Sequence, residues 1–145
     1  MGCDIHLHVE AKIHGEWQHW REPRVARCYA LFAMMADVRN DADEYRPISQ
    51  PRGLPNDASD ITKADYNSWS GDAHSASWLD SVEVAELCHR AEAVGLVQQS
   101  CDPYPPRFAR SRFGDGDYAT AGIGGDCACW PDEIEDFRFV FWFDN

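Results

Sequence analysis

The chain has 145 residues, of which 44% are hydrophobic and 12% aromatic, and it carries a formal net charge of −12. This content of large apolar side chains excludes an intrinsically disordered protein, and the length predicts one domain over residues 1–145. The negative charge disfavours direct binding to nucleic acid or to anionic membranes, because both present phosphate groups.

The cysteines and the absence of an apolar segment bear on the cellular compartment. The chain contains six cysteines, and we find neither a charged, apolar leader nor a run of about 18 apolar residues that would span a bilayer. We therefore expect a cytoplasmic protein without membrane attachment. Thiols stay reduced in that compartment, so we do not expect a disulfide framework.

The first regular segment is a strand over residues 3–13, in which apolar and polar side chains alternate. Side chains along a strand point alternately to its two faces, so one face is predicted to join the core and the other to carry polar groups. A tight turn at His14 and Gly15 leads to a second strand over residues 16–20. The apolar set is Cys3, Ile5, Leu7, Val9 and Ala11, and the polar set is Asp4, His6, His8 and Glu10.

The next segments alternate between helix and loop. Apolar residues over 25–36 recur at helical spacing, and Pro23 is suited to the first turn of that helix. Residues 37–57 are rich in Asp, Asn, Pro and Gly, which predicts a long surface loop. Ser59 is placed to cap a short helix that ends near Trp69.

The second half contains one capped helix and one strong strand. Residues 71–77 are polar and predict a turn, after which Asp80 and Glu83 have the spacing of a capping box. The helix that follows is predicted to end at Gly95. Residues 137–143 place four Phe on one face of a strand.

These elements predict an α+β fold. We expect a mainly antiparallel sheet that contains both terminal strands, with about three helices packed on one face. A further short strand is predicted over residues 118–123. The strand order does not follow from the sequence.

The motif D-x-H-x-H is formed by Asp4, His6 and His8. Residues two apart on a strand project side by side, so both imidazoles can reach one metal ion, and the carboxylate can add a ligand or orient a histidine. The motif resembles the first-strand motif of amidohydrolase-type and polymerase-and-histidinol-phosphatase-type hydrolases. This resemblance covers five residues and implies a catalytic metal but not the barrel fold of those enzymes. A solvated strand face is the alternative interpretation.

A second polar cluster contains Asp72 and His74. If this segment folds over the first strand, its two side chains complete a His/carboxylate site for Zn, Mn or Fe. Helix capping and turn formation are the alternative roles. In the metal interpretation Glu10 acts as the general base, and Arg52 in the long loop neutralises an anionic substrate.

Three strings of the sequence resemble a group of small bacteriophage-encoded proteins. They are Met1–Glu10, Pro51–Pro55 and Gly71–Leu79, together with the Phe-rich end. The resemblance implies a context, which is expression inside a bacterial host cell, where small acidic phage proteins modify metabolism or block a defence system. It implies no particular activity.

Three functions follow from these observations. The first is a metal-dependent hydrolase or phosphoesterase acting on a small anionic substrate. The second is a non-catalytic acidic protein that occupies a basic, nucleic-acid-handling site on a host protein complex, as some anti-CRISPR proteins do. The third is a nucleotide-binding sponge, for which Arg107, Arg110 and Arg112 are the candidate ligands.

Overall fold

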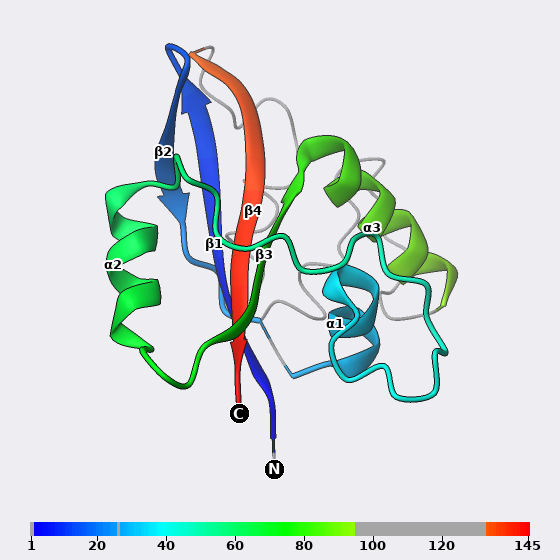
Figure 1. Cartoon of the computed structure of the whole chain (residues 1–145). Helices are drawn as coiled ribbons and strands as arrows, with labels where there is room; N and C mark the ends of the chain where they lie inside the picture. The colour runs from blue at the N-terminus through cyan, green and yellow to red at the C-terminus, as the bar shows by residue number, and fades with distance from the viewer. Residues whose placement is uncertain (1, 26, 95–132) are drawn as a thin grey trace.

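The computed structural model describes residues 2–25, 27–94 and 133–145. In these residues four strands form one antiparallel sheet in the order β2-β1-β4-β3, so that β1 and β4, near the two ends of the chain, lie at its centre (Figure 1). The predicted α+β class and the pairing of both terminal strands are confirmed. The elements are β1 (Asp4–Ile13), β2 (Glu16–Arg21), α1 (Tyr29–Ala36), α2 (Asp60–Ser68), β3 (His74–Asp80), α3 (Ser81–Ala93) and β4 (Ile134–Asp144).

The apolar face of the sheet forms the core, as the alternation in β1 and β4 predicts. Phe139, Phe141 and Phe143 are fully buried and lie opposite Val9, Leu7 and Ile5 of β1. Helices α1 and α3 cover this face, and the ring of Phe32 from α1 lies edge-on to Phe143 with centroids 5.1 Å apart. Burial of these rings is the main stabilising contribution in a domain of this size.

Helix α1 is shorter than its apolar spacing predicts. It begins at Tyr29 after the N-cap Cys28 and not near Pro23, and all its residues from Leu31 to Ala36 are buried. A helix that is buried on every side needs no polar face, so its sequence shows little amphipathic contrast. It ends where Asp37 adopts a left-handed conformation with φ of 60°.

Helix α3 begins with the predicted capping box. The Glu83 backbone N–H donates to Asp80 Oδ1 at 2.8 Å, and the Asp80 N–H donates to Glu83 Oε1 at 3.1 Å. These two bonds satisfy donors that an uncapped helix leaves unpaired. Val84, Leu87, Cys88 and Ala91 form the buried apolar stripe of α3, whereas Val94, which follows the helix, is 48% exposed.

Helix α2 lies on the opposite face of the sheet from α1 and α3 (Figure 1). The Tyr66 ring of α2 meets Trp142 edge-on with centroids 5.2 Å apart, and Trp142 belongs to the face of β4 that does not carry the Phe residues. The expectation that all the helices pack on one face therefore does not hold for α2. The fold has three layers because the second face also carries large apolar side chains that need cover.

Strand β3 begins within a segment predicted to be a turn. The turn covers residues 69–72, and His74 already pairs with β4. Small polar residues have weak strand propensity, so the pairing of Ser77 with Phe141 and of Leu79 with Phe139 decides the conformation here. The register shifts between His74 and Ser77, where Ser75 is left-handed with φ of 54°.

The long loop predicted over residues 37–57 is confirmed, since no helix or strand forms between α1 and α2. It passes from the α1 face to the α2 face of the sheet and is bound to β3 by the Gly53 N–H, which donates to the Ala76 carbonyl at 2.8 Å. Gly53 has φ of +83°, a conformation that favours glycine. The loop therefore places residues 57–59 over the polar side of β1.

Some sequence predictions concern residues outside the described part of the chain. These are the strand over 118–123, the helix end at Gly95 and the basic cluster of Arg107, Arg110 and Arg112. Among the helices of the described residues, none has the length and apolar character needed to cross a membrane.

Candidate functional site

The polar face of β1 lies beneath α2, in register with the corresponding face of β4. His6 pairs with Trp142, His8 with Val140 and Glu10 with Arg138, so all six side chains lie on one face of the sheet. His8, Glu10, Val140 and Trp142 are fully buried, and Arg138 is 6% exposed. The polar row predicted from the sequence is thus a buried layer in its centre and not a solvated surface.

His8 lies at the centre of this layer with hydrogen bonds at both ring nitrogens. Its Nε2 is 2.7 Å from Asp65 Oδ2 of α2, and its Nδ1 is 2.9 Å from His19 Nε2 of β2. Since an ionised carboxylate only accepts, the Nε2–H of His8 donates to Asp65. When the His8 ring carries this one proton, the His19 Nε2–H donates to His8 Nδ1.

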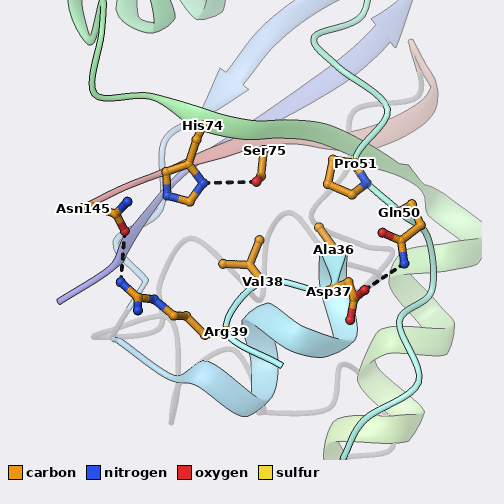
Figure 2. Close-up of a pocket in the computed structure, with 9 residues that line it drawn as sticks. All are labelled: Ala36, Asp37, Val38, Arg39, Gln50, Pro51, His74, Ser75 and Asn145. Carbon is orange, nitrogen blue, oxygen red and sulfur yellow. Dashed lines mark hydrogen bonds between the residues drawn. The ribbon is translucent and has the colours of Figure 1, made fainter. Parts of the chain in front are cut away.

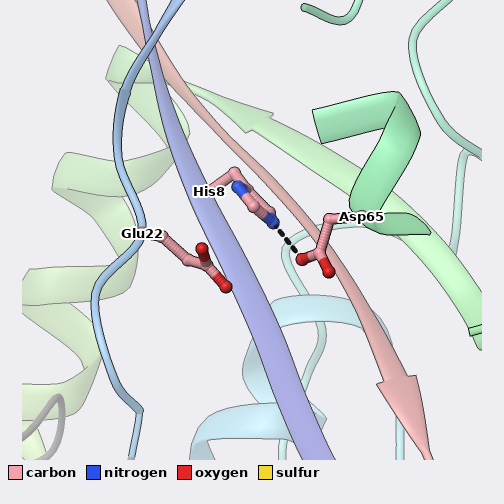
Figure 3. Close-up of side chains that lie close together, drawn as sticks. All are labelled: His8, Glu22 and Asp65. Carbon is pink, nitrogen blue, oxygen red and sulfur yellow. Dashed lines mark hydrogen bonds and ion pairs between the residues drawn. The ribbon is translucent and has the colours of Figure 1, made fainter. Parts of the chain in front are cut away.

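Glu22, just after β2, brings a second carboxylate close to His8 and Asp65 (Figure 3). His8, Glu22 and Asp65 each offer one ligand atom, and these three atoms lie within 4.8 Å of one another. Bonds of about 2.0–2.2 Å to one zinc ion place tetrahedral ligand atoms about 3.3 Å apart. Binding an ion therefore requires Asp65 and His8 to separate by about half an ångström from their 2.7 Å contact.

His19 is placed to hydrogen-bond the ring nitrogen of His8 that does not face Asp65. Burial lowers the pKa of His19 below its ordinary value, and the neighbouring His8 adds to this effect. A neutral His19 can accept a hydrogen bond from Nδ1–H of His8 when Nε2 of His8 binds an ion. Histidine ligands of metals characteristically carry such a partner on the second nitrogen.

Two predicted ligands on β1 are paired elsewhere. Asp4 is exposed and accepts two bonds of 2.8 Å from Arg27, which holds the pKa of Asp4 below its ordinary value. His6 Nε2 lies 2.8 Å from Asp144 Oδ2, and its ring lies 4.0 Å from that of Trp69. Neither residue belongs to the His8, Glu22 and Asp65 group.

The structure does not bring the predicted second cluster to His8. His74 stacks on Phe143, with centroids 6.1 Å apart, and so lies on the core face of the sheet at the end of α1 (Figure 2). Asp72 is exposed in the turn after α2. The register shift after His74 sets its side chain on this face, which the sequence gives no means to foresee.

Glu10, the predicted general base, is fully enclosed by donors. Its Oε1 accepts from Arg138 Nε at 3.0 Å and Nη2 at 2.8 Å, and its Oε2 accepts from the Ser59 N–H at 2.7 Å and the Thr62 hydroxyl at 2.8 Å. Burial raises the pKa of Glu10, but these hydrogen bonds outweigh that effect and hold it below its ordinary value. Such contacts assign Glu10 to the attachment of α2 and its preceding loop.

Arg52, the predicted substrate-binding cation, attaches the long loop to β3 and α3. Its guanidinium donates to Glu83 Oε1 at 2.8 Å and to the Trp78 carbonyl at 3.0 Å, and it lies 4.5 Å from the centre of the Trp78 ring. Strand β4 lies between β3 and the strand that carries His8. Arg52 is thus placed at the opposite edge of the sheet from β2.

The Arg52 and Glu83 pair predicts a pH-dependent stability. The hydrogen bond from Arg52 is the largest cause that lowers the pKa of Glu83 below its ordinary value of 4.5. This stabilisation is therefore fully present above about pH 4.5 and is lost as the pH falls through the lower pKa of the folded state. We expect Glu83→Gln to reduce the free energy of unfolding by about 1 kcal/mol at neutral pH, because the pair is partly exposed to solvent.

Urea unfolding of the wild type and of Glu83→Gln at about pH 7 and about pH 3 measures this difference. We expect the difference between the two proteins to become smaller at the lower pH, because Glu83 of the wild type takes up a proton as the pH falls through its lowered pKa. A difference that stays the same at both pH values would contradict the proposed role of the ionised carboxylate.

Sequence reasoning missed three of the four residues that meet at this site. A two-residue turn at His14 and Gly15 pairs position 10 with position 19. The hairpin therefore predicts that His19 lies beside the polar face of β1. No sequence signal indicated Asp65 or Glu22, since nothing in the sequence places α2 or the end of β2 beside His8.

The interpretation of this group rests on its own geometry. The ligand atoms are close together, one ring is buried, and the carboxylates reach solvent, with Glu22 exposed and the Asp65 side chain 28% exposed. No protein-family model matches the chain, and neither a curated protein nor a solved structure matches it.

Proposed function

We propose that His8, Glu22 and Asp65 bind one divalent metal ion and that the protein is a metal-dependent hydrolase. The convergence of one buried imidazole and two carboxylates within 4.8 Å supports this proposal. A mixed set of one nitrogen and two oxygen donors suits Zn, Mn or Fe. The predicted D-x-H-x-H motif contributes one ligand, His8, and the other two come from outside the motif.

Three protein ligands leave a coordination position open for water, and a bound ion lowers the pKa of such a water toward neutrality. His8 fixes the ion against the sheet, since its ring is fully buried. Asp65 and Glu22 face solvent, so a substrate can approach from their side. The ion also offsets the repulsion between a small anionic substrate and a chain with a net charge of −12.

Two further contacts hold these ligands in place. The hydrogen bond between His8 Nδ1 and His19 Nε2 fixes the orientation of the His8 ring. Glu10 binds Ser59 and Thr62, and thereby anchors the start of the helix that carries Asp65. We place the reaction in the cytosol of a bacterial host cell, in keeping with the free thiols of the described cysteines Cys3 and Cys28.

The test is a hydrolysis assay on protein that is purified without a metal-affinity step, stripped with a chelator and reloaded with Zn, Mn or Fe. The probes are p-nitrophenyl esters of phosphate, phosphodiester and acetate. We expect turnover only after reloading, and a loss in kcat/KM of more than about 100-fold in His8→Ala and Asp65→Asn.

His6→Ala is the matched control, because His6 lies on the same strand and face but pairs with Asp144. Its activity should stay within about threefold of the wild type, a factor worth less than 1 kcal/mol. Hydrolysis that persists in the stripped protein, or equal losses in His6→Ala and His8→Ala, would count against the proposal.

The net charge of −12 favours a second candidate function, which is a non-catalytic inhibitor that occupies a basic site on a host complex. This function needs acidic surface groups and does not need His8. A complex that weakens steeply with added salt, and that forms equally well with His8→Ala, would support it over the hydrolase.

A further inference from the structure

A cavity of about 360 Å³ opens at the end of α1, on the face of the sheet opposite His8 (Figure 2). Its size lies within the range of small-molecule pockets in proteins. The polar side chains that line it come from the start and the later part of the long loop, and from the facing ends of β3 and β4. They are Asp37, Arg39, Gln50, His74, Ser75 and Asn145.

His74 has a buried ring nitrogen that makes no hydrogen bond to any of the residues that the structure describes. Its Nδ1 lies 3.1 Å from the Ser75 hydroxyl, and its Nε2 is shielded from solvent and has no hydrogen-bond partner in the described part of the chain. If the hydroxyl donates to Nδ1, the ring proton lies on Nε2 as an unused donor. Buried polar atoms are nearly always paired, so an unpaired one in the wall of a cavity indicates a missing partner.

Arg39 lies at the same end of the cavity as His74. Its Nη2 donates to Asn145 Oδ1 at 3.0 Å, and Asn145 follows Phe143, the β4 partner of His74, by two residues. The guanidinium lies 5.8 Å from the centre of the Tyr29 ring, which further fixes its position. The Cys3 thiol is a further hydrogen-bond partner of Arg39. A guanidinium has five N–H donors in a planar fork that matches phosphate and carboxylate oxygens, so a ligand can share Arg39 with these protein partners.

The other end of the cavity carries a carboxylate. Asp37 accepts from Asn40 at 2.7 Å and from Gln50 at 2.9 Å, and these bonds hold the pKa of Asp37 below its ordinary value. Figure 2 shows Asp37 and Gln50 on one side of the cavity, and Arg39, His74 and Asn145 on the other. The cavity thus has a cationic and an anionic end.

Several residues that line this cavity have an unusual, left-handed backbone conformation. Five non-glycine residues in the described part of the chain have a left-handed φ, and three of them, Asp37, Arg39 and Ser75, line the cavity. This conformation is unfavourable for residues with a side chain, and residues that adopt it cluster at functional sites.

We propose that the cavity binds a small polar molecule through a phosphate or carboxylate group, which accepts hydrogen bonds from Arg39 and, once a small rotation of the His74 ring exposes its Nε2–H to the cavity, from His74. A hydroxyl or amino group of the same molecule then faces Asp37. The site is separate from the proposed metal centre, because the sheet lies between His74 and His8.

Nuclear magnetic resonance of the full-length ¹⁵N-labelled protein tests this proposal, with inorganic phosphate and acetate added to millimolar concentration at constant ionic strength. We expect saturable shifts of the Arg39 Nε–H, the His74 ring and the Asn145 amide. Arg39→Gln and, separately, His74→Gln should each weaken binding by roughly tenfold or more. A response to phosphate alone identifies the ligand group as phosphate, and a response to acetate alone identifies it as carboxylate.

Two controls separate this result from general effects. His8→Ala should bind the anions as the wild type does, so failure of the metal proposal leaves this one intact. Arg90→Gln, which removes a cation of α3, controls for charge. No saturable shift with either anion, or an unchanged affinity in both Arg39→Gln and His74→Gln with native-like spectra, would overturn the proposal.

Discussion

Arg138→Ala is expected to lower the free energy of unfolding by about 3–5 kcal/mol, the cost of leaving a buried charge without its partner. Glu10 has no exposed surface, and two of its four hydrogen bonds come from Arg138. Arg138 also donates to Asp57 Oδ1 at 3.0 Å, and its guanidinium lies 4.2 Å from the Trp17 ring centre. The substitution therefore removes one centre that joins β4, β1, β2 and the long loop.

Urea unfolding followed by circular dichroism measures this effect. Arg90→Ala is the matched control, because Arg90 pairs with Glu86 on the surface of α3, where such a pair contributes about 0.3–0.5 kcal/mol. The double variant Glu10→Gln/Arg138→Met should lose less than the sum of the single variants, because no buried charge is then left unpaired. A loss below about 1 kcal/mol in Arg138→Ala would show that the pair does not anchor this face.

Trp142→Ala is expected to cost about 3–5 kcal/mol, the usual range for removing a large buried ring. Trp142 is fully buried between the sheet and α2, with the His6 and His8 rings stacked at 5.8 and 5.2 Å and Tyr66 edge-on at 5.2 Å. Without this ring α2 loses the aromatic contact that Tyr66 makes with the sheet. Amide hydrogen exchange in α2 should consequently become faster than the exchange in α3.

Trp142→Phe is the control for this second substitution, because it keeps an aromatic ring beneath α2 and should cost markedly less. Thermal or urea unfolding of both variants, together with hydrogen exchange, measures the two effects. Equal exchange rates in α2 of the wild type and of Trp142→Ala would contradict the view that this tryptophan holds α2 to the sheet.

The parts of the fold that follow from local pattern were predictable. Alternation over residues 3–13 and 137–143 located β1 and β4, the turn at His14 and Gly15 located the first hairpin, and Asp80 with Glu83 located the start of α3. In each case the signal lies within a few residues of the element that it specifies.

The parts that depend on tertiary pairing were not predictable. Strand β3 forms from small polar residues because β4 offers an apolar partner, and α2 covers the second face because Trp142 needs burial. The alternation at β4 identified the face of the Phe residues but gave no sign that Val140 and Trp142 are equally buried on the other side.

The candidate site likewise contains one residue that a local pattern predicted and others that it did not. The position of His8 on the polar face of β1 followed from strand periodicity, whereas Asp65 and Glu22 come to it through the placement of α2 and the end of β2. His74 is on the opposite face because of a register shift that no local pattern reports. The tertiary fold decides which metal ligands from separate elements come together. A motif of five residues can therefore identify only the ligands that lie within it.

The most direct test of the metal centre is a titration of chelator-stripped protein with Zn²⁺ or Mn²⁺, followed by calorimetry and native mass spectrometry. We expect one equivalent to bind to the wild type and to His6→Ala, and the affinity to fall by more than about 100-fold in His8→Ala and Asp65→Asn. Circular dichroism of each variant confirms that it is folded. No binding by the wild type, or equal binding by folded His8→Ala, would contradict a metal centre built on His8, Glu22 and Asp65.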